Sequence, residues 1–240
     1  MRLVFGVQPV REAVRAHGES IEQVLVEEGD HPQLEALARF ARDQGIEVTV
    51  AARAELDRRA RGARHQGVMA LVPELRLHSL ASLTVDPSSL FLALDEIQDP
   101  QNFGAAIRSA VAFGASAVIW PEHSSAPLSP ATFRASAGAI EHAVLCRVTS
   151  LPSAIAHLGE LGATSVALDA SGDVPLADVD LTGPVLFVIG SEGKGLKKSV
   201  RRACARTARL PMGGAIDSLN ASVAAAVALY EARHQRRPKG

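Results

Sequence analysis

Apolar residues of this chain fall into short runs that alternate with stretches of helical periodicity. In the first 75 residues this pattern predicts helices over 7–16, 32–44 and 54–58 and strands over 24–28, 47–51 and 68–72. Strands and helices in this order are typical of a small α/β domain.

The periodicity stops after residue 72, where two prolines stand among several Ser and Thr residues. We therefore predict a linker at 76–88, between a first domain of residues 1–75 and a second domain of residues 89–240.

The second domain repeats the alternation of strand and helix. Its predicted strands cover 90–95, 117–120, 145–148, 166–168 and 184–189, and its predicted helices follow Asn102, lie around 132–141 and 152–161, and close the chain at 220–235. This alternation predicts an α/β fold with a mostly parallel sheet.

Two glycine-rich segments, 186–196 and 210–220, come near the end of this alternation. Ligands of open α/β sheets bind beyond the carboxyl ends of the strands, where such loops lie. Gly190, Gly193 and Gly195 allow positive φ and let a ligand approach the backbone closely, which suits a bound nucleoside. The alternative is that these glycines only form tight turns.

Two common nucleotide motifs are excluded here. A P-loop needs Lys and then Ser or Thr directly after its last Gly, but Leu196 follows Gly195 and Lys197 comes one position late. No G-x-G-x-x-G segment opens a helix after an early strand with an acidic residue about 20 positions later. The loops therefore favour neither a nucleoside triphosphate nor NAD.

The polar segment 95–110 follows a predicted buried strand and leads into a helix. Asn102 is a candidate N-cap, and Arg108 lies nearly two turns into that helix. In a purely structural interpretation, Arg108 pairs with a carboxylate such as Asp95 or Glu141.

Composition excludes several classes. With 47% hydrophobic and 21% charged residues among 240, the chain is expected to be a soluble globular protein. It has no apolar run of membrane-spanning length and no signal-peptide pattern, so we expect a cytoplasmic protein without a membrane partner. Cys146 and Cys204 form no C-x-x-C pair and no H-E-x-x-H is present, so we expect no metal and two apolar, buried cysteines.

A formal net charge of −1 conceals local basic clusters. They comprise five arginines between residues 53 and 64, seven basic residues in 194–209, and Arg233, Arg236, Arg237 and Lys239 in the tail. Such clusters are either solvated faces or contacts for a polyanion, so RNA remains a candidate partner.

Three segments occur in an order that resembles a known family. Residues 99–104 read Asp-Pro-Gln-Asn-Phe-Gly and are followed by Arg108, 189–195 read Ile-Gly-Ser-Glu-Gly-Lys-Gly, and Leu-Pro-Met at 210–212 precedes Ser-Leu-Asn at 218–220. Together they resemble the motifs of the SpoU (TrmH-like) ribose 2′-O-methyltransferases of the SPOUT superfamily. Residues 213–217 differ from the usual third motif.

The resemblance extends to the first domain. Residues 5–7 and 65–68 resemble the ribosomal-protein-like RNA-binding domain that precedes the catalytic domain in family members that methylate a guanosine ribose of 23S rRNA. The resemblance implies a trefoil-knotted catalytic domain, a homodimer packed through the knot region, S-adenosylmethionine as cofactor, and 23S rRNA or a pre-ribosomal particle as partner.

Site residues follow from the same resemblance. It implies cofactor contacts at Leu168, Gly190, Glu192, Gly195, Leu210, Met212, Ser218 and Leu219, and a reaction centre of Asn102, Arg108, Glu192, Ser218 and Asn220.

The reaction implied is an in-line displacement on the methyl sulfonium by a ribose 2′-oxygen. Arg108 is the family's usual candidate base, but a guanidinium keeps its proton at any physiological pH. We therefore favour stabilisation of the developing oxyanion by Arg108, with Asn102 orienting it. Glu192 and a substrate phosphate both stay open as the base.

Other functions are compatible with these motifs. Within the class they include ribose methylation of tRNA and rRNA methylation that confers antibiotic resistance. In another class, a ribosome-assembly protein binds RNA without methylating it, although such a protein has no need of Asn102, Arg108, Glu192 and Asn220 together. Residues 65–67 favour 23S rRNA.

Overall fold

The computed structural model describes residues 1–215 and 218–237, which form two compact units. The smaller unit consists of Met1–Leu75 with Leu128–His142, and the larger of Arg76–Pro127 with Ala143–Gly240. Ile216 and Asp217 of the second glycine-rich segment, and Lys239 of the basic tail, lie outside the described residues.

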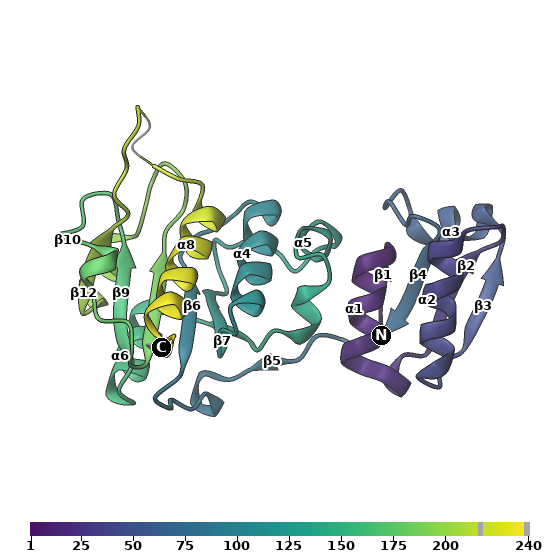
Figure 1. The fold of residues 1–240 in the computed structure, drawn as a ribbon, viewed down its shortest axis with the longest axis horizontal. Coiled ribbons are helices and arrows are strands. Elements are labelled where there is room, and N and C mark those ends of the chain that lie inside the picture. Colours follow the sequence, from purple (N-terminus) through teal and green to yellow (C-terminus); the bar gives the residue numbers. More distant parts are fainter. Residues whose placement is uncertain (216–217, 238–240) are drawn as a thin grey trace. The chain divides into compact units, whose positions relative to one another are not determined.

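A four-stranded sheet in the order β1-β4-β2-β3 forms the centre of the smaller unit (Figure 1). Its strands are β1 Arg2–Phe5, β2 Gln23–Glu27, β3 Val48–Ala51 and β4 Val68–Val72, and its helices are α1 Val7–His17, η1 Gly18–Ser20, α2 Pro32–Asp43 and α3 Arg53–Ala60. Only β2 and β3 are parallel; β4 is antiparallel to β1 and to β2.

Side chains of these strands alternate between two cores. Val24 and Val26 pack with Val10 of α1 and Leu37 of α2 on one face, whereas Leu25 packs with Leu56 and Ala60 of α3 on the other. The pattern did not predict β1, because a four-residue strand becomes recognisable only through its pairing with the distant β4.

Residues 128–142 join this unit although they come from the middle of the second predicted domain. The helix expected over 132–141 is instead α5 Pro130–Ala135 and a short 3₁₀ turn, η3 Ala139–His142, because Ala137 and Gly138 take φ of +50° and +86° between them. A Cβ on Gly138 would lie 2.8 Å from the Cα of Pro9, so only glycine fits this close approach.

Glu141 anchors the inserted segment. Its carboxylate, with 1% of the side chain exposed, pairs with Arg2 and accepts a hydrogen bond from His17 Nε2 at 2.9 Å. The purely structural alternative in which Arg108 pairs with Glu141 is therefore wrong.

The larger unit contains an eight-stranded sheet in the order β10-β12-β9-β11-β6-β7-β8-β5, with every neighbouring pair parallel. Its strands are β5 Leu77–His78, β6 Leu90–Leu94, β7 Ala117–Pro121, β8 Leu145–Val148, β9 Thr164–Leu168, β10 Val174–Pro175, β11 Val185–Ile189 and β12 Arg206–Arg209. This confirms the predicted α/β fold with a parallel sheet.

Helices cover both faces of this sheet (Figure 1). They are α4 Pro100–Ala112, α6 Leu151–Glu160, α7 Lys198–Ala203 and α8 Ala221–Gln235, with short 3₁₀ turns η2 Leu80–Ser82 and η4 Leu176–Asp178. On one face α8 packs against α4 and β11, and on the other α6 packs with α7 over Phe91, Ile119 and Val188. The trefoil knot stays a prediction.

Two local expectations change. The predicted linker contains β5, which pairs with β8, and the buried Leu83.

The N-cap of α4 is Asp99, whose carboxylate accepts hydrogen bonds from Gln101 N at 3.2 Å and Asn102 N at 3.1 Å. Asn102 is not the N-cap, and its amide is therefore available for another contact.

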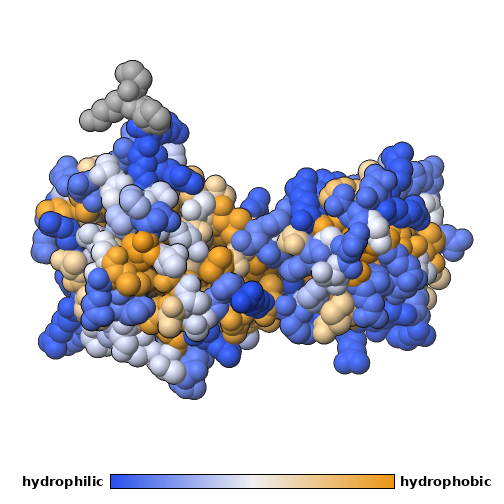
Figure 2. All heavy atoms as spheres, turned by 90° about the horizontal axis from the view of Figure 1, so that it is seen from below, coloured by the Kyte–Doolittle hydropathy of each residue, from blue (hydrophilic) through white to orange (hydrophobic). Residues whose placement is uncertain are grey.

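Hydrophilic residues predominate on the visible face of the smaller unit, whereas apolar patches interrupt that of the larger unit (Figure 2). Within residues 1–215 and 218–237, no helix combines the length and apolar character needed to cross a membrane.

Cys146 is buried and Cys204 is half-buried, and both are free thiols.

Arg236 secures the end of α8, and Arg236→Ala is expected to destabilise the larger unit by about 2–4 kcal/mol, because four carbonyls, three of them in part-buried hydrogen bonds, lose a charged donor. Its guanidinium donates to Leu181 O (2.9 Å), Ser88 O (2.7 Å), Ser89 O (3.2 Å) and Gly183 O (2.6 Å). Thermal melts beside the exposed control Arg237→Ala measure this loss, and equal melting temperatures for the two variants contradict it.

Candidate functional site

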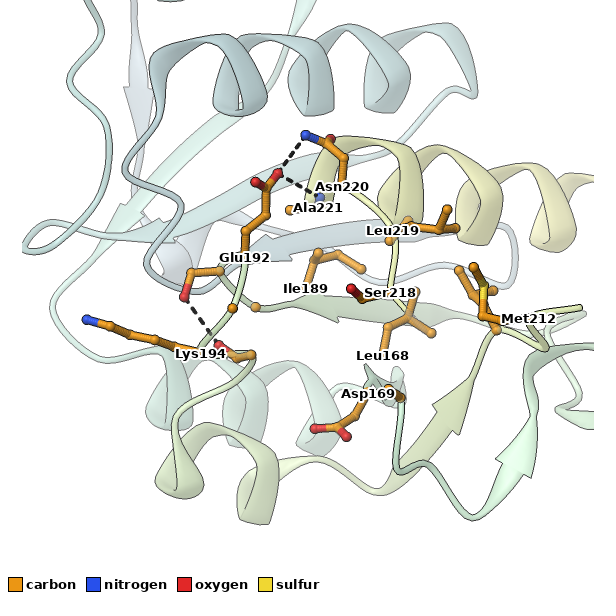
Figure 3. A pocket seen from close by; sticks show the side chains of 17 residues that line it. Leu168, Asp169, Ile189, Glu192, Lys194, Met212, Ser218, Leu219, Asn220 and Ala221 are labelled. Atoms are coloured by element: carbon orange, nitrogen blue, oxygen red, sulfur yellow. Dashed lines mark hydrogen bonds between the residues drawn. The ribbon is translucent and has the colours of Figure 1, made fainter. Parts of the chain in front are cut away.

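A pocket of about 660 Å³ lies at the carboxyl ends of β9 and β11 and beside the N-terminus of α8 (Figure 3). Parallel sheets bind ligands at this edge because the loops leaving their strands open there. The lining residues are Leu168, Asp169, Ala170, Ile189, Gly190, Ser191, Glu192, Gly193, Lys194, Gly195, Leu210, Met212, Ser218, Leu219, Asn220, Ala221 and Ala224. The volume is in the range of small-molecule sites.

The loop after β11 closes on itself. Ser191 N donates to Gly195 O at 3.1 Å, and Gly195 N donates to Ser191 O at 2.9 Å. A Cβ on Gly190 would lie 2.3 Å from the carbonyl carbon of Gly195, so the turn closes only with glycine at this position. Gly193 and Gly195 take φ of +78° and +65°, and beyond the adjacent residues no atom lies within 4 Å of where their Cβ would be. The glycines thus form a tight turn and also give the pocket a wall of exposed backbone.

The opposite side of the pocket is apolar. Leu168, Met212 and Leu219 lie around Ser218, well separated from Glu192 (Figure 3). Met212 is 39% exposed and Leu219 38% exposed, so both offer apolar surface to a ligand in the pocket. An apolar side facing free backbone suits the flat base of a nucleoside.

A polar cluster of Asn102, Glu192 and Asn220 occupies the other end. Asn102 Nδ2 donates to Glu192 Oε1 at 2.8 Å, and Asn220 Nδ2 lies 2.6 Å from the same oxygen and 2.7 Å from Asn102 Oδ1. The backbone N–H of Ala221 also points to Glu192 Oε1, at 3.3 Å. Three segments far apart in the sequence therefore meet at one carboxylate oxygen.

The start of α8 supports this cluster. Asn220 caps the helix, since its Oδ1 accepts from Ser222 N at 2.9 Å and Val223 N at 3.3 Å. Because the free N–H groups of a helix N-terminus carry partial positive charge, they stabilise the Glu192 carboxylate beside them. The Glu192 side chain is thereby held at the edge of the pocket.

Two other carboxylates shape this region. Burial raises the pKa of Asp95, although its Oδ2 accepts a hydrogen bond from Lys197 N at 2.8 Å, which acts in the opposite direction. This bond ties the end of the glycine loop to β6. Burial acts to raise the pKa of Asp169, but hydrogen bonds from Ser171 N and Oγ together with the charge of Arg201 lower this pKa below its usual value.

All eight residues expected to contact the cofactor line this pocket. Of the expected reaction centre, Glu192, Ser218 and Asn220 line it as well, and Asn102 is hydrogen-bonded to two of them. Their roles stay predictions. The sequence analysis did not include Asp169 and Lys194 among the expected site residues, although both line the pocket. Asp169 directly follows a predicted strand, at the edge of the sheet where ligands bind.

Arg108 is not among the pocket-lining residues. It is exposed and comes six residues after Asn102 on α4, which turns it roughly 120° away around the helix. Within the described part of the chain it forms no ion pair, and Asp95 bonds to Lys197 N instead. The structural interpretation of Arg108 as a partner of Asp95 or Glu141 is wrong.

Among residues 1–215 and 218–237, no three His, Cys, Asp or Glu side chains are grouped so that they could hold a metal ion.

Comparisons with known proteins match both parts of the chain. The model of the SpoU rRNA Methylase family matches residues 89–230, and the model described as RNA 2′-O ribose methyltransferase substrate binding matches residues 3–78. A Mycobacterium ulcerans protein named as an uncharacterized tRNA/rRNA methyltransferase is 40% identical over 240 residues, which cover 98% of this chain and 77% of that protein.

Solved structures are similar over the same length. The SpoU methyltransferase AviRb from Streptomyces viridochromogenes, in complex with AdoMet, has a TM-score of 0.79 and 31% identity and covers 98% of this chain and 90% of its own. An AdoMet-bound rRNA methyltransferase from Sinorhizobium meliloti has a TM-score of 0.80 and 28% identity, covering 98% and 88%. The chain therefore belongs to the SpoU rRNA Methylase family and is an RNA methyltransferase whose methyl donor is S-adenosylmethionine.

Proposed function

We propose that this protein methylates the 2′-oxygen of a guanosine ribose in 23S rRNA, as free RNA or within a pre-ribosomal particle. The observation that carries this proposal is the polar cluster of Asn102, Glu192 and Asn220 at one end of a glycine-walled pocket. A protein that only binds RNA has no use for three motif residues held at one carboxylate oxygen. The match of residues 3–78 to a substrate-binding model supports RNA as the partner.

The pocket fits S-adenosylmethionine, which supplies an electrophilic methyl group. We assign the adenine ring of the cofactor to the apolar side around Leu168, Met212 and Leu219. The turn from Gly190 to Gly195 supplies the main-chain contacts to the cofactor. Glu192 and Asn220 hold the start of α8 and the glycine turn in one arrangement, so they position the walls of the site.

Arg108 acts on the substrate in this proposal. An exposed guanidinium that no carboxylate of the described residues neutralises is available to a polyanion from solution. It stabilises the charge that develops on the ribose oxygen during transfer. Proton removal falls to Glu192 or to a phosphate of the RNA.

A second copy of this chain completes the assembly. Val223, Val227 and Tyr230 share one face of α8 and are 46%, 39% and 46% exposed. An apolar stripe of this kind on a helix is typical of a protein interface, which supports a homodimer. We further propose that this dimer acts in the cytoplasm.

Two measurements test the proposal. Calorimetric titration with S-adenosylmethionine should show binding in the presence of a chelator, because the proposed site needs no metal. Mapping of 2′-O-methyl groups in total RNA, with and without the protein, should show one 23S rRNA guanosine that depends on it. A dependent site in tRNA contradicts the assigned substrate, and the absence of any dependent site contradicts methylation itself.

A further inference from the structure

A hollow of about 700 Å³ opens at the edge of the smaller sheet, outside the methyltransferase pocket. Leu3 and Phe5 of the edge strand β1 form its apolar floor, and Arg58, Arg59 and Arg61 at the end of α3 form its rim. The floor is partly open because this face of the sheet carries α3, which has only eight residues and packs over Leu25 and Met69.

The rim has positive charge to offer a ligand. Arg58 and Arg59 are already paired with Glu55. Arg61 and Arg64 are exposed and, within residues 1–215 and 218–237, lie within ion-pair distance of no carboxylate. Arg64 also lines a second hollow of about 500 Å³, and Ala63 lines both, so the loop 61–66 borders two hollows.

This loop is held in one conformation at a cost in backbone strain. Arg61 and Gln66 take φ of +48° and +53°, which non-glycine residues adopt rarely. Gln66 Oε1 accepts a hydrogen bond from Val7 N at 3.1 Å, which fixes the loop to the start of α1. Strain that the surrounding contacts sustain is typical of functional segments.

The buried side chain of His65 holds the loop through two hydrogen bonds. It is 4% exposed, its Nδ1 accepts from Gly67 N at 3.0 Å, and its Nε2 therefore carries the proton that it donates to Asp57 Oδ1 at 2.9 Å. The backbone that carries Arg61 and Arg64 is therefore already ordered before a ligand binds, which lowers the entropic cost of binding.

We propose that the hollow takes one unstacked base of single-stranded RNA against Phe5, with the flanking phosphates on Arg61 and Arg64. This inference rests on the proposed function, since it supposes an RNA substrate. An aromatic ring beside basic side chains is the combination that single-stranded nucleic acid requires, because each unpaired base has a face to stack and each linkage has a negative charge. A duplex keeps its bases stacked and cannot fill the hollow.

The test measures the affinity of the full-length protein for a fluorescent oligouridine and for a blunt RNA duplex over a range of salt concentrations. Phe5→Leu removes the aromatic ring but keeps an apolar side chain against the core of Leu25, Leu56, Ala60 and Met69. It should weaken oligouridine binding about tenfold, whereas the duplex affinity and the salt slope should stay unchanged. Arg61→Ala should lower the salt slope for oligouridine by about 0.7, the value for one phosphate contact on a single strand. Arg15→Ala, which removes an exposed arginine of α1 that is paired with Glu12, is the control for charge and should leave that slope near the wild-type value.

Thermal melts confirm that the variants are folded. Unchanged oligouridine affinity in folded Phe5→Leu overturns the base site, and an equal loss for oligouridine and duplex also overturns it by showing a phosphate contact without stacking. Cofactor titration and rRNA methylation by the wild type are recorded in parallel. If these succeed while Phe5→Leu has no effect, the inference fails and the proposed function stands, whereas wild-type protein that binds oligouridine but methylates no RNA contradicts the proposed function.

Discussion

Arg108→Ala is expected to lower the single-turnover rate of RNA methylation by about 10²- to 10³-fold, which is the effect of losing one donor to a developing oxyanion. The affinity for S-adenosylmethionine should stay the same, because Arg108 does not line the pocket. The melting temperature of Arg108→Ala should equal that of the wild type, because Arg108 is exposed and has no ion pair among the described residues.

Arg108→Lys is the matched variant for this prediction. A lysine retains the charge but not the planar fork of donors, so it should restore only part of the rate. If Arg108 removes the proton itself, the wild-type rate should keep rising with pH well past neutrality, and that result contradicts oxyanion stabilisation. An unchanged rate in folded Arg108→Ala rules out any part in the chemistry.

Gly190→Ala is expected to weaken S-adenosylmethionine binding by about 10- to 100-fold. The added Cβ would lie 2.3 Å from Gly195 C and 2.5 Å from Leu196 N, so the glycine turn has to open. Forcing a methyl group into such a space costs about 1–3 kcal/mol, and each 1.4 kcal/mol is tenfold in affinity. Calorimetric titration measures the loss.

Gly159→Ala is the control for this substitution, because it adds the same methyl group within α6 at a point where no atom outside the neighbouring helix backbone lies within 4 Å. It should bind the cofactor as the wild type does. Gly195→Val is less informative, since a β-branched residue at φ +65° strains the backbone whether or not a ligand is present. Unaltered affinity in Gly190→Ala would mean that the turn is not part of the cofactor site.

The sequence alone was sufficient for the elements whose signal is local. Continuous apolar runs predicted the strands that became β6 and β11, in which every residue is buried. Periodicity placed α2, α6 and α8 within a few residues of their observed limits. The second and third motifs, recognised through the family resemblance, contain most of the residues that line the pocket, whereas the first motif contains none of them.

Other features depended on contacts between distant residues. The polar alternation of β12, Arg206–Arg209, becomes a strand only beside β9, and Leu77–His78 becomes β5 only beside β8. The inserted residues 128–142 join the smaller unit through the contacts of Glu141 and Gly138, which no periodicity encodes.

The sequence by itself therefore determined the α/β class and the parallel sheet, because apolar spacing acts over a few residues. The expected site residues came from the resemblance of its motifs to a known family. Only the tertiary structure decided that Asp99 rather than Asn102 caps α4, that Asn102 bonds to Glu192 and Asn220, and that Arg108 does not line the pocket. The physical reason is that a hydrogen bond between residues some 90 positions apart, as between Asn102 and Glu192, exists only once the sheet has brought its strand ends together.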